Sequence, residues 1–304
     1  MKNVLVTGGT VFVSRYVAEY YVRKGFHVFV LNRNNRQQSD KVTLIEADRH
    51  QLSDELKNYN FDVILDMTAY SGDDVERLLD AVDDFGDYIL LSSSAVYPEY
   101  CSQPFRESTQ LGDNKFWGAY GIGKIGAEQV LLKRKPDAYI IRPSYLYGPM
   151  NNVYREAFVF ECALNDRKFY LPKNGKMKLQ FFYIDDLCRV MDIILEQKPD
   201  EHVFNVGNRE AVSVRDWVSQ CYEAAGKKPE FVSVYNDEEQ RKYFSFYDYE
   251  YCLDVSIQEK YLPEEKKLKD GIKESFVWYL NHAHMVNRKP YIEYIDANLK
   301  ATMQ

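Results

Sequence analysis

The sequence has few cysteines, and their arrangement excludes two classes of small stabilised protein. The five cysteines are far apart, odd in number and contain no CxxC pair: Cys101, Cys162, Cys188, Cys221 and Cys252. A disulfide framework or a structural zinc site needs closely spaced or paired cysteines, and intracellular thiols stay reduced. We therefore interpret these side chains as small hydrophobes in a reducing cytoplasm. We predict no metal centre.

Long apolar runs and a positive net charge are also missing. No apolar stretch approaches the roughly 20 residues of a membrane-spanning helix. The first residues lead directly into the short run "NVLVT" (3–7) rather than the apolar region of a signal peptide. A net charge of −7 provides no global attraction to a nucleic-acid backbone or an anionic membrane. We therefore predict a cytoplasmic protein without a membrane or nucleic-acid partner, although a local basic groove is compatible with this charge.

What the sequence does contain is a regular alternation of strand and helix patterns. At 304 residues with 45% hydrophobic content, the chain is long enough for a well-buried core and two lobes. Helical spacing follows the first apolar run and recurs at 73–84. The predicted strands of the first half are residues 3–7, 27–31, 42–47, 62–67 and 87–94. Buried strands joined by helices form a doubly wound parallel sheet, the Rossmann arrangement.

The second half is less regular. A helix is predicted at 120–135, and a strand that runs into a turn at 137–149. They are followed by a strand and helix at 179–197, a strand at 202–207 and a helix at 213–226. We predict a first domain of residues 1–150 and a smaller α/β lobe of residues 151–304. The strands near 180–207 are expected to return to the first domain. Residues 284–304 form a polar and aromatic tail that is compatible with a helical extension.

The turn after the first strand, "GGTVFVS" (8–14), has the position of a nucleotide-binding loop. Amide groups at a helix N-terminus bind anions, and glycine lets the backbone approach a pyrophosphate. Val11 and Ser14 stand where such loops usually carry glycine. Val11 cannot offer a close approach, whereas Ser14 is small enough for helix–strand packing. An ordinary strand-to-helix connection remains the alternative interpretation of this stretch alone.

Two further stretches carry candidate chemistry. "LLSSSAVYP" (90–98) places three serines at the end of a strand, where ligands bind in such sheets. Tyr120 and Lys124 are four residues apart and share one helix face. A neighbouring cation lowers the pKa of a phenol from about 10 towards neutrality, which suits it to proton transfer. Tyr20 and Lys24 have the same spacing, so this motif is weak evidence when taken alone.

The order of these motifs resembles the extended short-chain dehydrogenase/reductase family, the NAD-dependent epimerases and dehydratases. The resemblance continues through "RPSYLYGP" (142–149), "FFYIDDLCRVM" (181–191) and "FNVG" (204–207). It implies that Tyr120 is the general acid/base and that Ser93, with Ser94 as its neighbour, binds the developing oxyanion. Lys124 corresponds to the lysine that holds the nicotinamide ribose. The implied reaction is hydride exchange between a nicotinamide and a carbinol carbon of the substrate.

The resemblance also implies a cofactor site for NAD or NADP. Asp48 would meet the adenine, and "LDMTAY" (65–70) would lie beside the pyrophosphate and ribose. NAD-preferring relatives usually carry an acidic residue at the place of Asn32, whereas Arg33 or Arg36 here could bind a 2′-phosphate. Solvated arginines are the alternative, and we favour NADP over NAD. The predicted cofactor-binding residues are Gly8, Gly9, Thr10, Val11, Phe12, Asn32, Arg33, Asp48, Thr68, Ala69, Tyr120, Lys124 and Pro143.

The substrate implied by the resemblance is a nucleotide sugar. Ser94, Tyr145 and Lys178 are the predicted substrate-binding residues. Two positions depart from the pattern, since Tyr145 stands where many members carry Asn and Leu179 where they often carry Arg. The resemblance further implies a homodimer formed through the helices near 73–84 and 119–134.

A second hypothesis stays open at this point. The Gly-Gly-Thr-x-Phe loop and a Gln at position 180 resemble the plant chloroplast stem-loop-binding proteins, members of the same family that are associated with RNA. The chain would then be an RNA-binding or cofactor-sensing protein on the same fold. The complete set of Ser93, Tyr120 and Lys124 favours the enzyme, because a binding protein has no need for a tuned phenol.

Overall fold

The computed structural model describes residues 2–235 and 239–299. Seven parallel strands form the central sheet in the order β3–β2–β1–β4–β5–β6–β11. Their bounds are β1 Asn3–Thr7, β2 His27–Asn32, β3 Thr43–Glu46, β4 Phe61–Asp66, β5 Phe85–Leu91, β6 Tyr139–Pro143 and β11 Val203–Val206. The order reverses between β1 and β4, and ligands bind at such a switch point, outside the carboxyl ends of the strands. The predicted doubly wound fold is confirmed.

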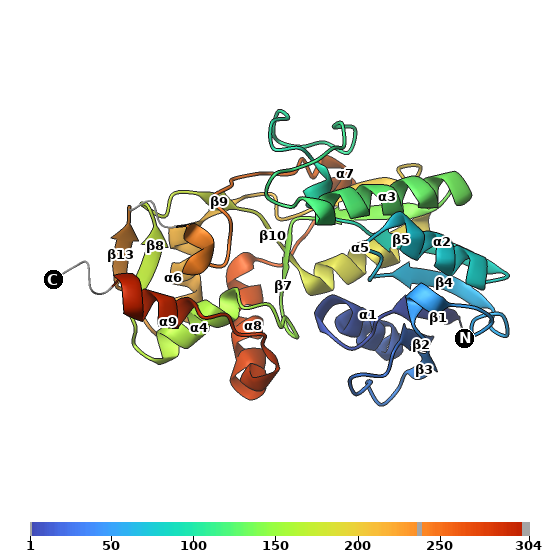
Figure 1. Cartoon of the computed structure of the whole chain (residues 1–304), viewed down its shortest axis with the longest axis horizontal. Helices are drawn as coiled ribbons and strands as arrows, with labels where there is room; N and C mark the ends of the chain where they lie inside the picture. The colour runs from blue at the N-terminus through green and yellow to red at the C-terminus, as the bar shows by residue number, and fades with distance from the viewer. Residues whose placement is uncertain (1, 236–238, 300–304) are drawn as a thin grey trace.

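Helices cover both faces of the sheet because successive strand side chains point to opposite sides. Val4 and Val6 face the layer with α1 and α5, while Leu5 faces the layer with α2 and α3. All three strand residues are fully buried. The helices are α1 Phe12–Arg23, α2 Gly72–Ala81, α3 Ala119–Arg134 and α5 Ile184–Gln197 (Figure 1).

The second lobe lies beside the carboxyl edge of the sheet and contains short strand pairs with helices packed against them (Figure 1). Trp217 stacks on Phe181 at 5.5 Å between ring centroids in its core. The elements are β7 Tyr145–Tyr147, α4 Glu156–Leu164, β8 Phe169–Pro172, β9 Lys178–Leu179, β10 Phe181–Tyr183, β12 Val212–Ser213, α6 Val214–Ala224, β13 Phe231–Val234, α8 Leu268–His282 and α9 Tyr291–Tyr294. The helix α7 Ser256–Tyr261 returns to the first lobe, where it packs against β11 and α5. One hydrophobic cluster runs from β1 to α8, so the two lobes share a core.

The segment 137–149, predicted as a strand that runs into a turn, contains the strand β6 and a second short strand, β7. The N–H of Ser144 still donates to the carbonyl of Val206 in β11 (2.8 Å), whereas the N–H of Tyr145 donates to the carbonyl of Gln180 (3.2 Å). The chain therefore leaves the central sheet at Ser144, and β7 pairs with β10. Of the strands near 180–207, β11 pairs with β6. The boundary at residue 150 stays a prediction.

The remaining expectations concern single residues and the termini. Cys162, Cys188 and Cys221 are buried and Cys101 and Cys252 half-buried, and all five are free. Burial raises the pKa values of the three buried thiols. No helix within residues 2–235 and 239–299 is long and apolar enough to cross a membrane. The predicted tail forms short helical turns up to residue 299, and residues 300–304 lie outside the described residues.

Candidate active site

The turn between β1 and α1 depends on both of its glycines. Gly8 and Gly9 have φ angles of 91° and 83°, a region that residues with a Cβ rarely adopt. A Cβ on Gly9 would lie 2.4 Å from Cγ1 of Val30, and one on Gly8 would lie 2.8 Å from Oγ of Ser14. The glycine turn is therefore packed tightly against Val30 of β2 and against Ser14 in the first turn of α1.

The N-terminus of α1 is open to a ligand. Its N-cap is Val11, which provides no side-chain hydrogen bond, and the first turn carries no acidic residue. Ser14 does not close the helix end either, because its hydroxyl donates to the carbonyl of Val11 (3.0 Å). The free N–H groups of the first turn thus retain their affinity for an anion. The turn fits the pyrophosphate of a dinucleotide, with Ser14 in the place of the third glycine.

A buried carboxylate fixes the adjacent strand ends. Asp66, the last residue of β4, is fully buried and accepts hydrogen bonds from Thr7 (2.7 Å) and Tyr88 (2.7 Å). Arg49 donates to its two oxygens at 3.0 and 3.1 Å. Burial acts to raise the pKa of Asp66, but the guanidinium outweighs it and lowers that pKa to about 2. Arg49 also donates to Thr68 (3.1 Å), so this network holds the loop after β4 beside the glycine turn.

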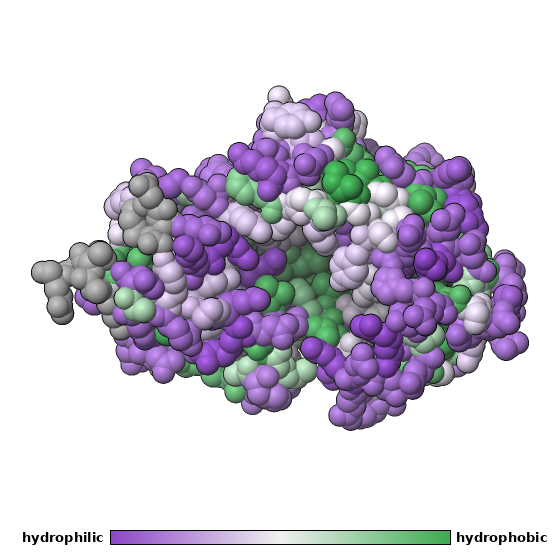
Figure 2. Space-filling view, viewed as in Figure 1, coloured by the Kyte–Doolittle hydropathy of each residue, from purple (hydrophilic) through white to green (hydrophobic). Residues whose placement is uncertain are grey.

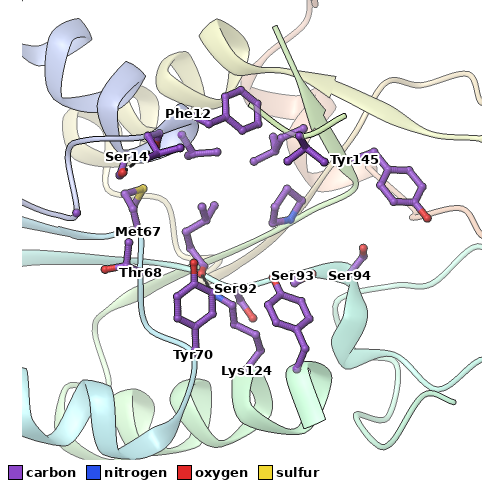
Figure 3. Close-up of a pocket in the computed structure, with 18 of the residues that line it drawn as sticks. Phe12, Ser14, Met67, Thr68, Tyr70, Ser92, Ser93, Ser94, Lys124 and Tyr145 are labelled. Atoms are coloured by element: carbon purple, nitrogen blue, oxygen red, sulfur yellow. Dashed lines mark hydrogen bonds between the residues drawn. The ribbon is translucent and has the colours of Figure 1, made fainter. Parts of the chain in front are cut away.

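Lys124 is buried below the pocket. It is 2% exposed, and its Nζ donates to the carbonyl of Leu91 (2.7 Å) at the end of β5. Burial lowers the pKa of Lys124 to about 8. The ring of Tyr70 covers the ammonium, with Nζ 5.1 Å from the ring centroid. Figure 3 shows the two side chains next to each other, below Ser92.

Tyr120 lines the same pocket, but Lys124 does not tune it as the sequence predicted. Nζ of Lys124 lies 5.9 Å from the Tyr120 ring centroid and points to the Leu91 carbonyl. Desolvation raises the pKa of Tyr120, while a hydrogen bond with Ser93 acts to lower it. The expectation that Lys124 lowers this pKa is therefore wrong for the chain itself, because the ammonium is committed to the backbone. Ser93 and Arg155 are the side chains that act to lower the pKa of Tyr120.

The three serines after β5 have three different partners. Ser92 donates to Glu128, which is paired with Arg142 in the core. Ser93 is half-buried, and its hydroxyl accepts from the N–H of Ala95 (3.2 Å) at the start of a short 3-10 helix. Ser94 donates to the hydroxyl of Tyr251 (3.0 Å). The predicted strand at 87–94 accordingly ends at Leu91, and only Ser93 is directed to Tyr120.

These groups line one pocket between the lobes, with a volume of about 640 Å³. Figure 2 shows the hollow, with hydrophobic side chains on its floor. In Figure 3, Phe12 and Ser14 form one wall, and the serines and Lys124 form the opposite wall. Trp117, just before α3, completes it together with Arg155 and Tyr251, and none of these belongs to a motif that marks it. The predicted residues that line the pocket are Gly8, Thr10, Val11, Phe12, Thr68, Ser93, Ser94, Tyr120, Lys124, Pro143 and Tyr145.

Other predicted cofactor residues lie around or behind this pocket. Asn32 donates to the carbonyl of Gly8 (2.6 Å) and so supports the turn. Arg33 is exposed, and its guanidinium lies 3.9 Å from the carboxylate of Asp48. Asp48 accepts from the N–H of His50 (3.0 Å). Gly9 packs on Val30, and Ala69 is fully buried behind the pocket wall.

Lys178 does not reach the pocket. It is exposed on β9, whose partner is β12, and its backbone N–H donates to Glu250 (2.6 Å). Leu179 is 1% exposed and belongs to the hydrophobic core. Tyr145 does reach the pocket wall, where burial raises its pKa to about 12. The structure therefore brings together Ser94 and Tyr145 but not Lys178.

Comparison with known proteins identifies the family. The profile of the NAD dependent epimerase/dehydratase family matches residues 4–207. The chain belongs to this family. The match covers the whole central sheet, the glycine turn and the Ser93–Tyr120–Lys124 set, and it confirms the resemblance noted in the sequence. Within the described residues, no group of three or more His, Cys, Asp or Glu side chains could hold a metal ion.

The similar sequences include a stem-loop binding protein and a GDP-L-fucose synthase. The chloroplast stem-loop binding protein of 41 kDa b of Arabidopsis thaliana is 25% identical over 301 residues, which is 90% of this chain and 78% of that protein. The probable GDP-L-fucose synthase 1 of Oryza sativa subsp. japonica is 26% identical over 217 residues, 64% of this chain and 62% of that protein. Identities of 25% and 26% indicate that these proteins are related to this chain, but they do not show that the activity is the same.

Solved structures share the fold. The UDP-glucuronic acid 4-epimerase of Bacillus cereus, in complex with UDP-glucuronic acid and NAD, has a TM-score of 0.72 and 19% identity over 92% of this chain and 99% of that one. The dTDP-glucose 4,6-dehydratase of Bacillus anthracis, in complex with NAD, has a TM-score of 0.72 and 16% identity over 94% of this chain and 99% of that one. The likeness extends over both lobes and establishes a common architecture.

Proposed function

We propose that the protein is an NAD(P)-dependent epimerase, dehydratase or reductase that acts on a carbinol of a nucleotide sugar. The observation that carries this proposal is the convergence of Ser93, Tyr120 and Lys124 on one pocket, opposite the open N-terminus of α1. The family match and the fold shared with nucleotide-sugar enzymes support it. We propose Ser94 and Tyr145 as the substrate side of the same pocket.

The chain would hold its cofactor with groups that are already arranged. The glycine turn and the first N–H groups of α1 would receive the pyrophosphate, Thr68 would flank the ribose with Ala69 packed behind it, and Pro143 would lie near the nicotinamide. Lys124 provides a cation for the nicotinamide ribose. When bound, the dinucleotide supplies the acceptor and donor of a hydride. Asp48 and Arg33 lie at the adenine end.

Tyr120 would move the proton of the reacting hydroxyl. As a phenol in a pocket, it takes or gives that proton while Ser93 hydrogen-bonds the same substrate oxygen. Because the protein raises the pKa of Tyr120, the protonated phenol is its resting form. Ser93, which favours the phenolate, is placed to assist when Tyr120 acts as a base.

The alternative, an RNA-binding or cofactor-sensing protein, is not favoured by the family match, although one similar protein is a stem-loop binding protein. The discriminating experiment is a thermal-shift and turnover screen with UDP-, GDP-, TDP- and CDP-sugars and a short stem-loop RNA. A response to at least one nucleotide sugar supports the enzyme. Salt-sensitive RNA binding without any sugar-nucleotide response would contradict it. The homodimer through α2 and α3 stays a prediction, which sedimentation can test.

Replacing Arg33 by Ala tests the preference for NADP. Arg33 is exposed at the end of β2 and carries only a long contact to Asp48, so its guanidinium is available to a 2′-phosphate. We expect Arg33→Ala to weaken NADP⁺ binding about tenfold or more, as the loss of a charge-assisted hydrogen bond does, and NAD⁺ binding less than about twofold. Calorimetric titration of both dinucleotides measures this. Arg77→Ala, on the exposed face of α2, is the control. Equal losses for both dinucleotides would remove Arg33 from this role.

The buried ammonium of Lys124 predicts a pH-dependent stability. Its pKa is about 8 in the folded chain and 10.5 ordinarily, so between these values the unfolded state binds more protons and stability rises with pH. We expect the free energy of unfolding of the wild type, relative to Lys124→Met, to increase by about 3 kcal/mol from pH 7.5 to 10.5. Urea unfolding of both proteins across this range tests it. A difference that does not change with pH would show that Lys124 titrates alike in the folded and the unfolded chain, so that burial does not lower its pKa.

A further inference from the structure

The backbone of Tyr70 is held firmly beside α3. Its N–H donates to the carboxylate of Asp74, in the first turn of α2, at 2.8 Å. On the other side, a Cβ on Gly123 of α3 would lie only 2.1 Å from the carbonyl oxygen of Tyr70, so the two backbones are in direct contact. Gly123 immediately precedes Lys124. The backbone therefore fixes where the Tyr70 side chain begins relative to Lys124.

The side chain of Tyr70 is held far less firmly than its backbone. Tyr70 is 56% exposed, and its hydroxyl forms no hydrogen bond within the described residues. The contacts of its ring are the ammonium of Lys124, at 5.1 Å from the ring centroid, and the ring of Tyr120, at 6.3 Å between centroids. Exposed side chains change rotamer quickly. The ring can therefore turn about a fixed backbone without disturbing the core.

The Tyr70 ring closes the access to Lys124. Lys124 lines the pocket between the lobes but is only 2% exposed. Its ammonium is surrounded by the carbonyl of Leu91 at 2.7 Å and by the rings of Tyr70 and Tyr120, and Figure 3 shows the Tyr70 ring beside it. Leu91 is a strand residue, and Tyr120 is hydrogen-bonded to Ser93. A ligand oxygen that reaches Nζ therefore displaces the Tyr70 ring.

We propose that the Tyr70 ring is a gate over Lys124, which is closed in the free chain and opens when the nicotinamide ribose of the dinucleotide binds at the ammonium. The proposal rests on the proposed function, which places that ribose at Lys124. In the closed state the ring face stabilises the ammonium by cation–π contact, and in the open state the ribose hydroxyls take its place. The gate acts through the ring, so the hydroxyl of Tyr70 has no part in it.

The gate lowers the apparent affinity for the dinucleotide. That affinity is reduced by the fraction of molecules in which the gate is open, and a cation–π contact favours the closed state about three- to thirtyfold. A ligand that binds at the glycine turn without reaching Lys124 does not meet the gate. ADP is such a ligand, because it carries the adenine, its ribose and the pyrophosphate but no nicotinamide ribose.

The test is calorimetric titration of the full chain with NAD⁺, NADP⁺ and ADP. We expect Tyr70→Ala to bind at least one dinucleotide about three- to thirtyfold more tightly than the wild type, and to bind ADP within about twofold of it. Tyr70→Phe keeps a ring over the ammonium, so it should bind all three ligands within about twofold of the wild type. Phe85→Ala is the matched control. It removes a ring whose centroid lies 5.7 Å from the ammonium of Lys135, at the other end of α3, and should change dinucleotide affinity less than about twofold.

Lys124→Met tests whether the gain in affinity arises at the ammonium. Without the ammonium the ring has no cation to cover, so adding Tyr70→Ala to Lys124→Met should change dinucleotide affinity less than about twofold. An equal gain from Tyr70→Ala in both backgrounds would show that the ring obstructs the pocket whether or not the cation is present. That result would overturn the gate over Lys124.

The two proposals fail in different ways. If neither dinucleotide binds the wild type at 10 mM, a concentration about tenfold above a millimolar Kd, the proposed function is wrong and the gate falls with it. If a dinucleotide binds the wild type and Tyr70→Ala leaves its affinity unchanged or weakens it, the gate is overturned while the proposed function stands. A thermal unfolding transition close to that of the wild type shows that Tyr70→Ala is folded.

Discussion

Replacing Tyr120 by Phe is expected to lower turnover by about 10²–10⁴-fold, the usual contribution of a general acid/base. The change removes the hydroxyl that moves the substrate proton and keeps the ring that lines the pocket. Because the ring stays, dinucleotide affinity and thermal stability are expected to remain close to those of the wild type. Turnover is measured on whichever nucleotide sugar responds in the screen.

A second ring in the pocket provides the matched control. Tyr70 lies 6.3 Å from Tyr120 between ring centroids and covers Lys124, but the mechanism assigns its hydroxyl no proton. Tyr70→Phe is expected to retain turnover within about threefold, less than 1 kcal/mol of barrier. If Tyr120→Phe retains full turnover, Tyr120 is only a wall of the pocket. If both variants lose activity equally, the loss comes from packing rather than from proton transfer.

Replacing Asp66 by Asn is expected to lower the free energy of unfolding by about 3–5 kcal/mol. Asp66 is fully buried and is the partner of Arg49, and removing one member of a buried ion pair leaves an uncompensated charge in the core. The amide also loses an acceptor for Thr7, Tyr88 or Arg49. Urea unfolding monitored by circular dichroism measures the difference.

The control for this prediction is an exposed pair of the same chemistry. Asp80 and Arg134 form an ion pair at 2.8 Å on the outer face of α2 and α3, and exposed pairs contribute about 0–1 kcal/mol. Asp80→Asn should therefore change stability by less than about 1 kcal/mol. Since the pKa of Asp66 is about 2 in the fold, its contribution is complete above about pH 4 and is lost as the pH falls through about 2. An Asp66→Asn variant as stable as the wild type would show that the network does not hold the strand ends.

The central sheet could be predicted because its information is local. Apolar runs at 3–7 and 62–67 alternate with helical spacing, and that alternation determines a parallel sheet. The break at Ser144 could not be predicted in this way. The sequence predicts a strand that runs into a turn at 137–149. A second strand forms after Ser144 because the N–H of Tyr145 donates to the carbonyl of Gln180 and the chain no longer continues beside β11.

The residues of the candidate site could likewise be predicted where they lie in local motifs, but their contacts with distant parts of the chain could not. The glycine turn, Ser93, Tyr120 and Lys124 lie in motifs, and the structure places them around one pocket. The direction of the Lys124 ammonium depends on the Leu91 carbonyl 33 residues earlier in the chain, which spacing on a helix does not reveal. The pKa of Tyr120 was accordingly predicted in the wrong direction.

The cover over Lys124 could not be predicted either. The sequence places "LDMTAY" (65–70) beside the cofactor, but the Tyr70 ring reaches the ammonium only because Gly123 lets the two backbones touch. Lys178 was predicted to bind substrate because it stands beside a motif position. The pairing of β9 with β12 turns Lys178 away from the pocket, an effect of tertiary structure alone.

The most direct test of the account is calorimetric titration of the purified chain with NAD⁺ and NADP⁺, after native mass spectrometry has shown whether either is already bound. The account predicts that at least one dinucleotide is carried through purification or binds with one equivalent per chain, because the turn at Gly8 and Gly9 leaves the N–H groups of α1 free for a pyrophosphate. No bound dinucleotide in the purified protein, together with no binding of either up to millimolar concentration, a binding free energy weaker than about −4 kcal/mol, would contradict it.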